Sequence, residues 1–360
     1  MKKNTVLALL LLSAAACSNN EEKSTTRQAD SVVVDTLPIK PAVVTDTTTH
    51  DTDDPAIWIN PQDPAKSLIL GTDKDEDGAL YVFDLSGKEV PGKTIHGLKR
   101  PNNVDIEYGF TWKGQSTDIA VVAERFTSKI RVFSLPDMKA IDNGGIDVFV
   151  GESGEGYRDL MGVACYKNNR GEVDVIIGRK NGPVDATYLW QYRLADSSGI
   201  LTAKLLRKFG KYSGKKEIEA IAVDDELGFI YYSDEGVGVR KYFADPAKGN
   251  DELALFAQDG FAGDHEGISI YNSGNKRGYI VVSDQQANKF RLFPREGDQG
   301  NAHKHSLLRT VKVEANQSDG SDVTAVALPG FPSGLFVAMS DNKTFHFYHW
   351  KDIAGELFVK

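Results

Sequence analysis

The 360-residue sequence predicts an all-β protein built from six copies of one unit, and three observations lead to this fold class. A polar opener that leads into a short alternating strand recurs at intervals of 48, 58, 58, 47 and 56 residues, with equivalent points at Pro55, Asn103, Met161, Glu219, Glu266 and Asp322. Each copy also contains two further strands rich in β-branched and aromatic residues. No run between the strands has the 3.6-residue periodicity of a helix. Repeats of about fifty residues with three or four strands each are typical of a propeller, so we expect a six-bladed β-propeller.

The three marked strands of each unit follow one order along the chain. The first strands begin DDPAIWI, NNVDIEY, LMGVACY, IEAIAVD, HEGISIY and SDVTAVA. The second strands are SLILGTDK, DIAVVAERF, VDVIIGRK, FIYYSDEG, YIVVSDQQ and LFVAMSDN. The third strands are ALYVFDL, KIRVFSL, YLWQYRL, VGVRKYF, KFRLFPR and TFHFYHW. The fourth, outermost strand of each blade is only weakly marked, and we expect residues 32–49 to lend a strand to the last blade and close the ring.

The N-terminal residues have the pattern of an export signal. Two lysines precede a short apolar run and a group of small residues, so we expect residues 1–16 to be removed. Cys17 follows the expected cleavage point and resembles the lipobox cysteine of bacterial lipoproteins; the alternative is an ordinary signal peptide with an incidental cysteine. We expect lipid on Cys17, a flexible tether over residues 17–44 and the propeller over residues 45–360. The protein would be exported and anchored to the cell envelope through its lipid alone, and the acidic residues after Cys17 are compatible with surface display.

Composition restricts the partners of the chain. The formal net charge is −9, and removal of residues 1–16, which contain two lysines and no acid, leaves −11 (40 basic against 51 acidic residues). A net acidic chain disfavours nucleic acid as a partner and suits calcium, which takes hard oxygen ligands. If Cys17 is acylated, Cys165 has no disulfide partner, and we expect it to be a buried core thiol. The expected assembly is a monomer.

Propeller topology predicts which side chains meet. The first strand of each blade lies beside the central channel and the second returns antiparallel to it, so first-strand starts and second-strand ends share one mouth of the channel. First-strand starts supply Asp53, Asp54, Asn102, Asn103, Asp105, Asp159, Glu219, Asp264, Glu266, Asp319 and Asp322. Second-strand ends supply Lys74, Arg125, Arg179, Lys180, Asp234, Glu235, Asp284, Gln285 and Asp341.

This predicted mouth has the chemistry of a metal site beside an anion site. Neighbouring carboxylates raise one another's pKa, and bound cations relieve that conflict. Oxygen ligands without a convergent His or Cys group favour several calcium ions over zinc. The other interpretation is that each acid only makes turn hydrogen bonds, which suffices for a single acid but less well for a group that recurs in nearly every blade. Basic side chains on three consecutive blades indicate an anionic substrate such as a phosphate ester.

The repeated motifs resemble the calcium-dependent β-propeller phytases. The matching stretches keep their order from about residue 45 to the C-terminus and are DDPAIW, NNVDIEYGF, IEAIAVDDELGFIYYSDE, DHEGISIY, VSDQQAN and SDGSDV leading to GLFVA. The resemblance implies a six-bladed propeller that hydrolyses myo-inositol hexakisphosphate (phytate), with calcium ions that stabilise the fold and bridge substrate phosphates. It places the calcium ligands of the family on Asp54, Asn103, Glu219, Glu235, Asp264, Glu266 and Asp319. It places the phosphate-binding residues of the family on Lys74, Arg125 and Arg179.

Two positions depart from the family pattern and bear on one metal site and on substrate preference. Met161 stands where the family has a tyrosine, and Lys180 stands where the family has an acid, in a stretch whose alignment tolerates a shift of one residue. The predicted metal ligands, with their neighbours, are Asp53, Asp54, Asn103, Asp105, Glu219, Glu235, Asp264, Glu266, Asp319 and Asp322. The predicted phosphate-binding residues are Lys74, Arg125, Arg179, Lys180 and Gln285. The predicted catalytic residues are Lys74, Arg125, Arg179, Glu219 and Glu235.

The expected activity is release of phosphate from phytate by calcium-assisted attack of water, as in a 3-phytase-type phosphoric monoester hydrolase. Two alternatives remain. A metal-dependent lactonase or esterase propeller would explain the carboxylates but not the run of basic residues. A non-catalytic, calcium-stabilised propeller that binds a partner on the cell envelope is kept open by Met161, which lacks the hydroxyl that would help to bind metal or phosphate.

Overall fold

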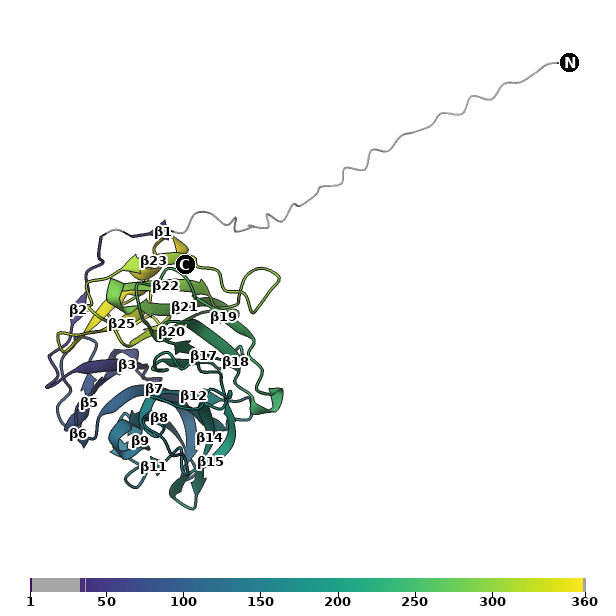
Figure 1. Cartoon of the computed structure of the whole chain (residues 1–360). Helices are drawn as coiled ribbons and strands as arrows, with labels where there is room; N and C mark the ends of the chain where they lie inside the picture. Colours follow the sequence, from purple (N-terminus) through teal and green to yellow (C-terminus); the bar gives the residue numbers. More distant parts are fainter. Residues whose placement is uncertain (2–32, 36, 359–360) are drawn as a thin grey trace. The chain divides into compact units, whose positions relative to one another are not determined.

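The structure is a computed structural model that describes Met1, residues 33–35 and residues 37–358. The predicted signal peptide and Cys17 lie outside the described residues. Six sheets of four or five strands follow one another along the chain, and each sheet is antiparallel apart from one added two-residue strand (Figure 1). The predicted six-bladed, all-β propeller is confirmed.

Each blade begins with the strand that lies beside the channel and continues outward. The innermost strands are β3 (Thr52–Trp58), β7 (Pro101–Trp112), β12 (Leu160–Lys167), β16 (Ile221–Asp224), β20 (His265–Gly274) and β24 (Ser321–Thr324). The second strands are β4 (Leu68–Asp73), β8 (Gln115–Glu124), β13 (Val173–Arg179), β17 (Phe229–Asp234), β21 (Arg277–Asp284) and β25 (Leu335–Ser340). The third strands are β5 (Gly78–Phe83), β9 (Lys129–Leu135), β14 (Leu189–Ser197), β18 (Gly238–Phe243), β22 (Lys289–Pro294) and β26 (Thr344–His349).

The outermost strands are the ones that the sequence marks least clearly. They are β6 (Ile95–Leu98), β10 (Lys139–Ala140) with β11 (Ile146–Asp147), β15 (Ile200–Phe209), β19 (Ala254–Phe256), β23 (Arg309–Lys312) and β2 (Val43–Val44). Because β2 pairs with β26, the N-terminal segment closes the last blade as predicted. A second early strand, β1 (Val33–Val34), pairs in parallel with β23 of the fifth blade. The paired part of the domain therefore begins at Val33, inside the range 17–44 that the sequence assigns to a tether.

The hydrophobic core is divided among the six interfaces between neighbouring blades. Each innermost strand contacts the next one, and β24 contacts β3, so the ring is closed. Alternate residues of one strand enter different interfaces: Val121 of β8 packs against the third blade, whereas Val122 packs against the first. Both faces of the inner strands are thus buried, which explains why these strands read as nearly continuous apolar runs. Cys165 belongs to one of these cores and is buried, as predicted.

Helices are few and short in the described residues. There is one α-helix, α1 (Trp350–Ala354), near the C-terminal end. The 3₁₀ turns are η1 (Pro64–Lys66), η2 (Arg125–Thr127), η3 (Pro246–Lys248), η4 (Gln285–Ala287) and η5 (Gly355–Leu357). Within the part of the chain that the structure describes, no helix has the length and apolar character needed to cross a membrane.

Candidate active site

β-Bulges mark the starts of four innermost strands. The pairing register shifts between Thr52 and Pro55, Pro101 and Val104, Leu160 and Val163, and His265 and Ile268. A bulge bends its strand and re-aims the side chains next to it. Consecutive polar residues occupy two of these bulges, Asp53 with Asp54 in β3 and Asn102 with Asn103 in β7. The bulges therefore explain how two adjacent aspartates reach different partners at one end of the channel.

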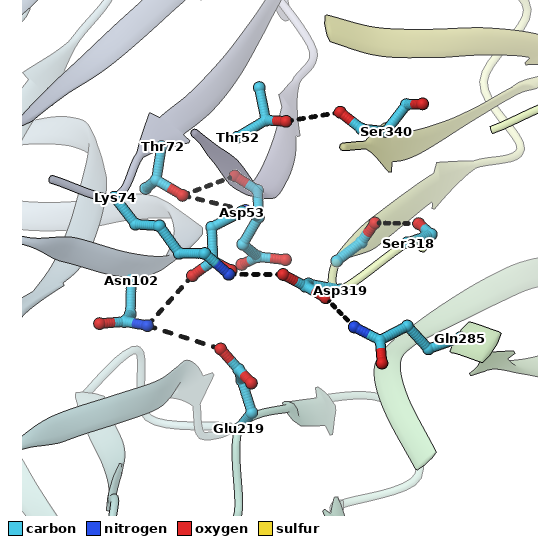
Figure 2. Close-up of polar contacts among 12 residues, drawn as sticks. Thr52, Asp53, Thr72, Lys74, Asn102, Glu219, Gln285, Ser318, Asp319 and Ser340 are labelled. Carbon is cyan, nitrogen blue, oxygen red and sulfur yellow. Dashed lines mark hydrogen bonds and ion pairs between the residues drawn. The ribbon is translucent and has the colours of Figure 1, made fainter. Parts of the chain in front are cut away.

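Lys74 occupies the centre of a polar network at this mouth (Figure 2). Its Nζ lies 2.8 Å from Asp53 Oδ1 and 2.5 Å from Asp319 Oδ2. Asn102 Nδ2 donates to Asp53 Oδ2 at 3.2 Å and to Glu219 Oε1 at 3.5 Å. Although burial opposes its charge, the two aspartates raise the pKa of Lys74, which stays protonated. The network joins side chains from the first, second, fourth and sixth blades, so the predicted convergence of first-strand starts with a second-strand end is present here.

Two overlapping groups of carboxylates lie at the same mouth. Glu217, Glu219 and Glu235 form one group, and Glu235, Asp264 and Glu266 form the other. In each group, one ligand oxygen per residue lies within 4.8 Å of the others. Glu235 belongs to both groups because it follows the end of β17, between the segment that precedes β16 and the start of β20.

Burial and mutual repulsion disfavour the ionised form of these acids. Burial, followed by the charge of Asp53, raises the pKa of Glu219 to about 8. Burial, followed by the charge of Glu219, raises the pKa of Glu235 to about 9. The pKa of Glu266 is raised well above its usual value by the same two causes. Without added positive charge, the site therefore holds protons that ordinary carboxyl groups lose near pH 4.5.

These pKa values predict how the stability of the protein depends on pH when a chelator removes metal. Between about pH 5 and pH 9, the unfolded chain has lost protons that folded Glu219 and Glu235 retain, so raising the pH favours unfolding. We expect the melting temperature in EDTA to fall by roughly 5–10 °C across this window. Thermal unfolding in EDTA at pH 5, 7 and 9, compared with the same series in saturating calcium, measures the effect. Parallel curves with and without calcium would contradict the assignment.

Several buried oxygens at the mouth and in the adjoining channel have no hydrogen-bond partner among the described residues. They are Asn102 Oδ1, Asn103 Oδ1, Glu235 Oε1 and Glu266 Oε2. Their residues are at most 6% exposed, and a buried polar atom without a partner is costly. All four atoms are hard oxygen donors, which is the ligand type that calcium prefers. The residues present therefore fit a hard divalent cation.

Arg125 places a guanidinium group with an unused hydrogen-bond donor beside the network. It is 8% exposed, its Nε has no hydrogen-bond partner in the described chain, and its Nη2 lies 4.0 Å from Asp159. Burial, followed by repulsion from Arg100, lowers the pKa of Arg125. Arg100 was not predicted from the sequence, and its Nη1 lies 3.4 Å from the carbonyl oxygen of Lys74. Two neighbouring guanidinium groups, of which Arg125 has only a long ion pair with Asp159, suit an anion.

Arg179 does not join this basic group, contrary to the prediction. Its side chain is fully buried, and its Nη1 lies 2.8 Å from Glu152 Oε2. Its guanidinium also packs against four aromatic rings, those of Phe149, Tyr157, Tyr188 and Trp190. The end of β13 thus turns this arginine into the core of its blade, and the next residue, Lys180, reaches the carboxylates instead, with its Nζ 3.1 Å from Glu217 Oε1.

Three predicted metal ligands line the channel and accept backbone hydrogen bonds from the neighbouring blade. Asp54 accepts the amide hydrogen bond of Val104, Asp105 accepts that of Cys165, and Asp322 accepts that of Ile57. Each bond joins an innermost strand to the next blade. The three carboxylates line a cavity of about 140 Å³, together with Asn103. In this structure their hydrogen bonds link neighbouring blades. This is the structural role that the sequence analysis gave as the alternative for individual acids.

The remaining predicted residues divide between the mouth and structural pairs. Gln285 Nε2 donates to Asp319, so Gln285 lies at the mouth. Asp234 and Asp284 instead form ion pairs with Arg240 and Arg291 on the third strands of their own blades. Asp341 accepts a hydrogen bond from Asn316 at 2.6 Å.

Two further residues affect the ligand set of the mouth: Met161 lacks a ligand oxygen, and Glu217 adds one. Met161 is buried at the bulge of β12 and offers no ligand oxygen. Glu217 was missed, although it stands two residues before Glu219 and shortly before a strand, and residues two apart in an extended chain share one side. That spacing was the available signal.

The fold and the mouth define a class of protein: a β-propeller hydrolase whose carboxylates suit a metal ion and whose neighbouring cations suit an anionic ester. The chain belongs to the phytase family, because the family model described as Phytase matches residues 2–354. A relative described as 3-phytase from Bacillus subtilis (strain 168) is 29% identical over 329 residues, which cover 85% of this chain and 81% of the relative. These matches confirm the resemblance drawn from the repeated motifs.

Proposed function

We propose that this protein hydrolyses phosphate monoesters of phytate at the channel mouth and uses calcium ions to do so. The observation that carries the proposal is the placement of the two carboxylate groups beside Lys74 and Arg125, in a chain of the phytase family. A phosphate ester needs both features, since its oxygens bind cations and its reaction requires an activated water.

The carboxylate groups would hold the cations, and the basic residues would hold phosphate. Glu219, Glu235, Asp264 and Glu266 supply oxygen ligands for calcium, with Glu217 as an added member. Bound calcium would neutralise phosphate oxygens and lower the pKa of a water molecule. Arg125 is suited to a phosphate oxygen because its Nε lacks a hydrogen-bond partner in the described chain and its ion pair with Asp159 is long, at 4.0 Å.

The residues of the chain then direct a hydrolysis in which water attacks phosphorus and the inositol oxygen leaves. Asp53 and Asp319 fix the ammonium of Lys74. Its charge would stabilise the negative charge that develops on the phosphoryl oxygens. Asn102 orients Asp53 and Glu219 through its amide hydrogens. A carboxylate oxygen of Glu219 that does not bind calcium would receive the proton that the water loses, and the leaving alkoxide would gain a proton from solvent. The products are inorganic phosphate and a lower inositol phosphate.

The direct test is phosphate release from phytate by the purified protein with calcium and with EDTA. We expect chelation to lower the rate by at least about 100-fold and added calcium to restore it. Hydrolysis that persists in EDTA would refute the calcium part of the proposal. Inactivity on phytate with rapid lactone opening would favour the lactonase alternative, and inactivity on both substrates by a folded, calcium-binding protein would favour the non-catalytic alternative.

We also propose that the exported protein carries lipid on Cys17 and acts as a monomer. The support for the anchor is the sequence of the first seventeen residues. The proposal of a monomer is supported by the ring of six blades, which closes within one chain where β24 contacts β3. Labelling with a radioactive fatty acid should mark the wild type and not Cys17→Ser, and light scattering of the unanchored domain should give the mass of one chain.

A further inference from the structure

Two lysines sit at the outer edge of the carboxylate groups, and each pairs with a different group. Lys180 Nζ lies 3.1 Å from Oε1 of Glu217, which belongs to the first group. Lys216 Nζ forms a short ion pair with Oδ1 of Asp264, which belongs to the second group. Each candidate cation position is therefore capped by one ammonium group.

The lysines do not satisfy the interior of the site. Glu235 and Glu266 are each only 4% exposed. Oε1 of Glu235 and Oε2 of Glu266 are buried and have no hydrogen-bond partner in the described part of the chain. The lysines pair with the more exposed carboxylates of Glu217 and Asp264 and contribute no hydrogen bond to these two buried oxygens. The buried carboxylates of Glu235 and Glu266 therefore lack a compensating positive charge, which a metal ion would supply.

The capping pairs are of a kind that a divalent cation can displace. The side chains of Lys180 and Lys216 are 42% and 51% exposed, whereas those of Glu217 and Asp264 are 26% and 14% exposed. Partly exposed ion pairs of flexible lysines are weak, and a lysine stem can carry its ammonium elsewhere without disturbing the backbone. A carboxylate that becomes a metal ligand loses much of its attraction for a neighbouring ammonium.

We propose that Lys180 and Lys216 are phosphate-binding residues that Glu217 and Asp264 hold in the cation-free protein and release when calcium binds. The inference rests on the proposed calcium-dependent function and adds to it. Lys216 then becomes a substrate-binding residue that the sequence did not indicate. Because the same lysines oppose calcium and favour phosphate, they couple the two ligands, and each ligand strengthens the binding of the other.

The experiment is calorimetric titration of Lys180→Gln, Lys216→Gln and the double variant with calcium alone, and then titration of the calcium-saturated proteins with inorganic phosphate. Each glutamine removes a positive charge that competes with calcium, so we expect calcium affinity to rise about 3- to 10-fold. Phosphate affinity at saturating calcium should fall by a similar factor, and most in the double variant.

Lys215→Gln is the matched control. Lys215 precedes Lys216, is exposed, and its Nζ lies 3.4 Å from the carbonyl oxygen of Gly236. We expect wild-type affinities for both ligands in this variant. Calcium affinity that is unchanged or lower in Lys216→Gln would overturn the inference, as would unchanged phosphate affinity.

The outcome for the wild type separates this inference from the proposed function. If the wild type binds no calcium, the calcium-dependent function itself fails. If the wild type binds calcium and releases phosphate from phytate, but all lysine variants behave like Lys215→Gln, only the coupling role of the lysines is lost.

Discussion

Glu235→Gln is expected to lower kcat/KM for phytate by roughly 100- to 1000-fold at saturating calcium. Glu235 belongs to both carboxylate groups, so its neutralisation weakens both candidate cation positions at once. Glutamine keeps the size of the side chain and one carbonyl oxygen but removes the charge that holds a divalent ion. Calcium titration should therefore show weaker binding, and the rate of phosphate release should fall with it.

The same substitution has an opposite effect on the metal-free protein. Burial, followed by the charge of Glu219, raises the pKa of Glu235, so in EDTA at neutral pH the folded protein keeps a proton that the unfolded chain has released, and this difference destabilises the folded state. Glutamine has no such proton to release, and we expect the melting temperature in EDTA to rise while the gain produced by calcium shrinks. For comparison, a ligand at 100 times its Kd adds about 2.7 kcal/mol.

Glu76→Gln serves as the control for this prediction. Glu76 is exposed in the turn that follows Lys74, and it belongs to neither carboxylate group. We expect its activity, calcium affinity and melting temperature to match the wild type. A Glu235→Gln enzyme with normal kcat/KM, or one that is less stable in EDTA than the wild type, would show that Glu235 is a packing residue instead of a cation ligand.

The repeat pattern made the fold predictable because each blade has the same order of a polar opener and three strands. Innermost and second strands such as β3 and β4 are buried on both faces, so their apolar runs are long and clear. Outer strands such as β10, with two residues, carry too little pattern to be read, because exposed edge residues vary freely. The strand β2 was inferred from the need to close the ring, and its pairing with β26 confirms that inference.

Topology also predicted much of the mouth, but it could not resolve the direction of single side chains. Asp53, Lys74, Glu219 and Asp319 meet because strand ends are fixed by the ring. The bulges in β3, β7, β12 and β20 are set by backbone pairing that one sequence does not display, and they decide which of two adjacent residues enters the channel. Asp54 consequently binds a neighbouring backbone amide, whereas Asp53 binds Lys74.

Arg179 is the residue for which sequence and structure differ most, and its substitution gives the second large expected effect. Arg179→Gln should lower the free energy of unfolding by about 3–5 kcal/mol, because it removes a fully buried guanidinium from among four aromatic rings and leaves Glu152 paired with Lys208 alone. Its Nε and Nη2 also donate to the carbonyl oxygens of Tyr188 and Thr187, and those bonds are lost too. Unfolding in urea at saturating calcium measures the change. We expect the folded fraction to keep its KM for phytate within about threefold.

Arg170→Gln tests whether the loss is specific to the buried position. Arg170 lies in the same blade, its side chain is 77% exposed, and it pairs with Glu172 at 2.8 Å. Exposed pairs contribute little, so we expect a change within about 0.5 kcal/mol. If Arg179→Gln instead unfolds like the wild type and raises KM strongly, the guanidinium must leave its aromatic cage to meet phosphate. The third blade would then contribute a substrate ligand, as the motif resemblance implies, and the burial of Arg179 would describe only the substrate-free state.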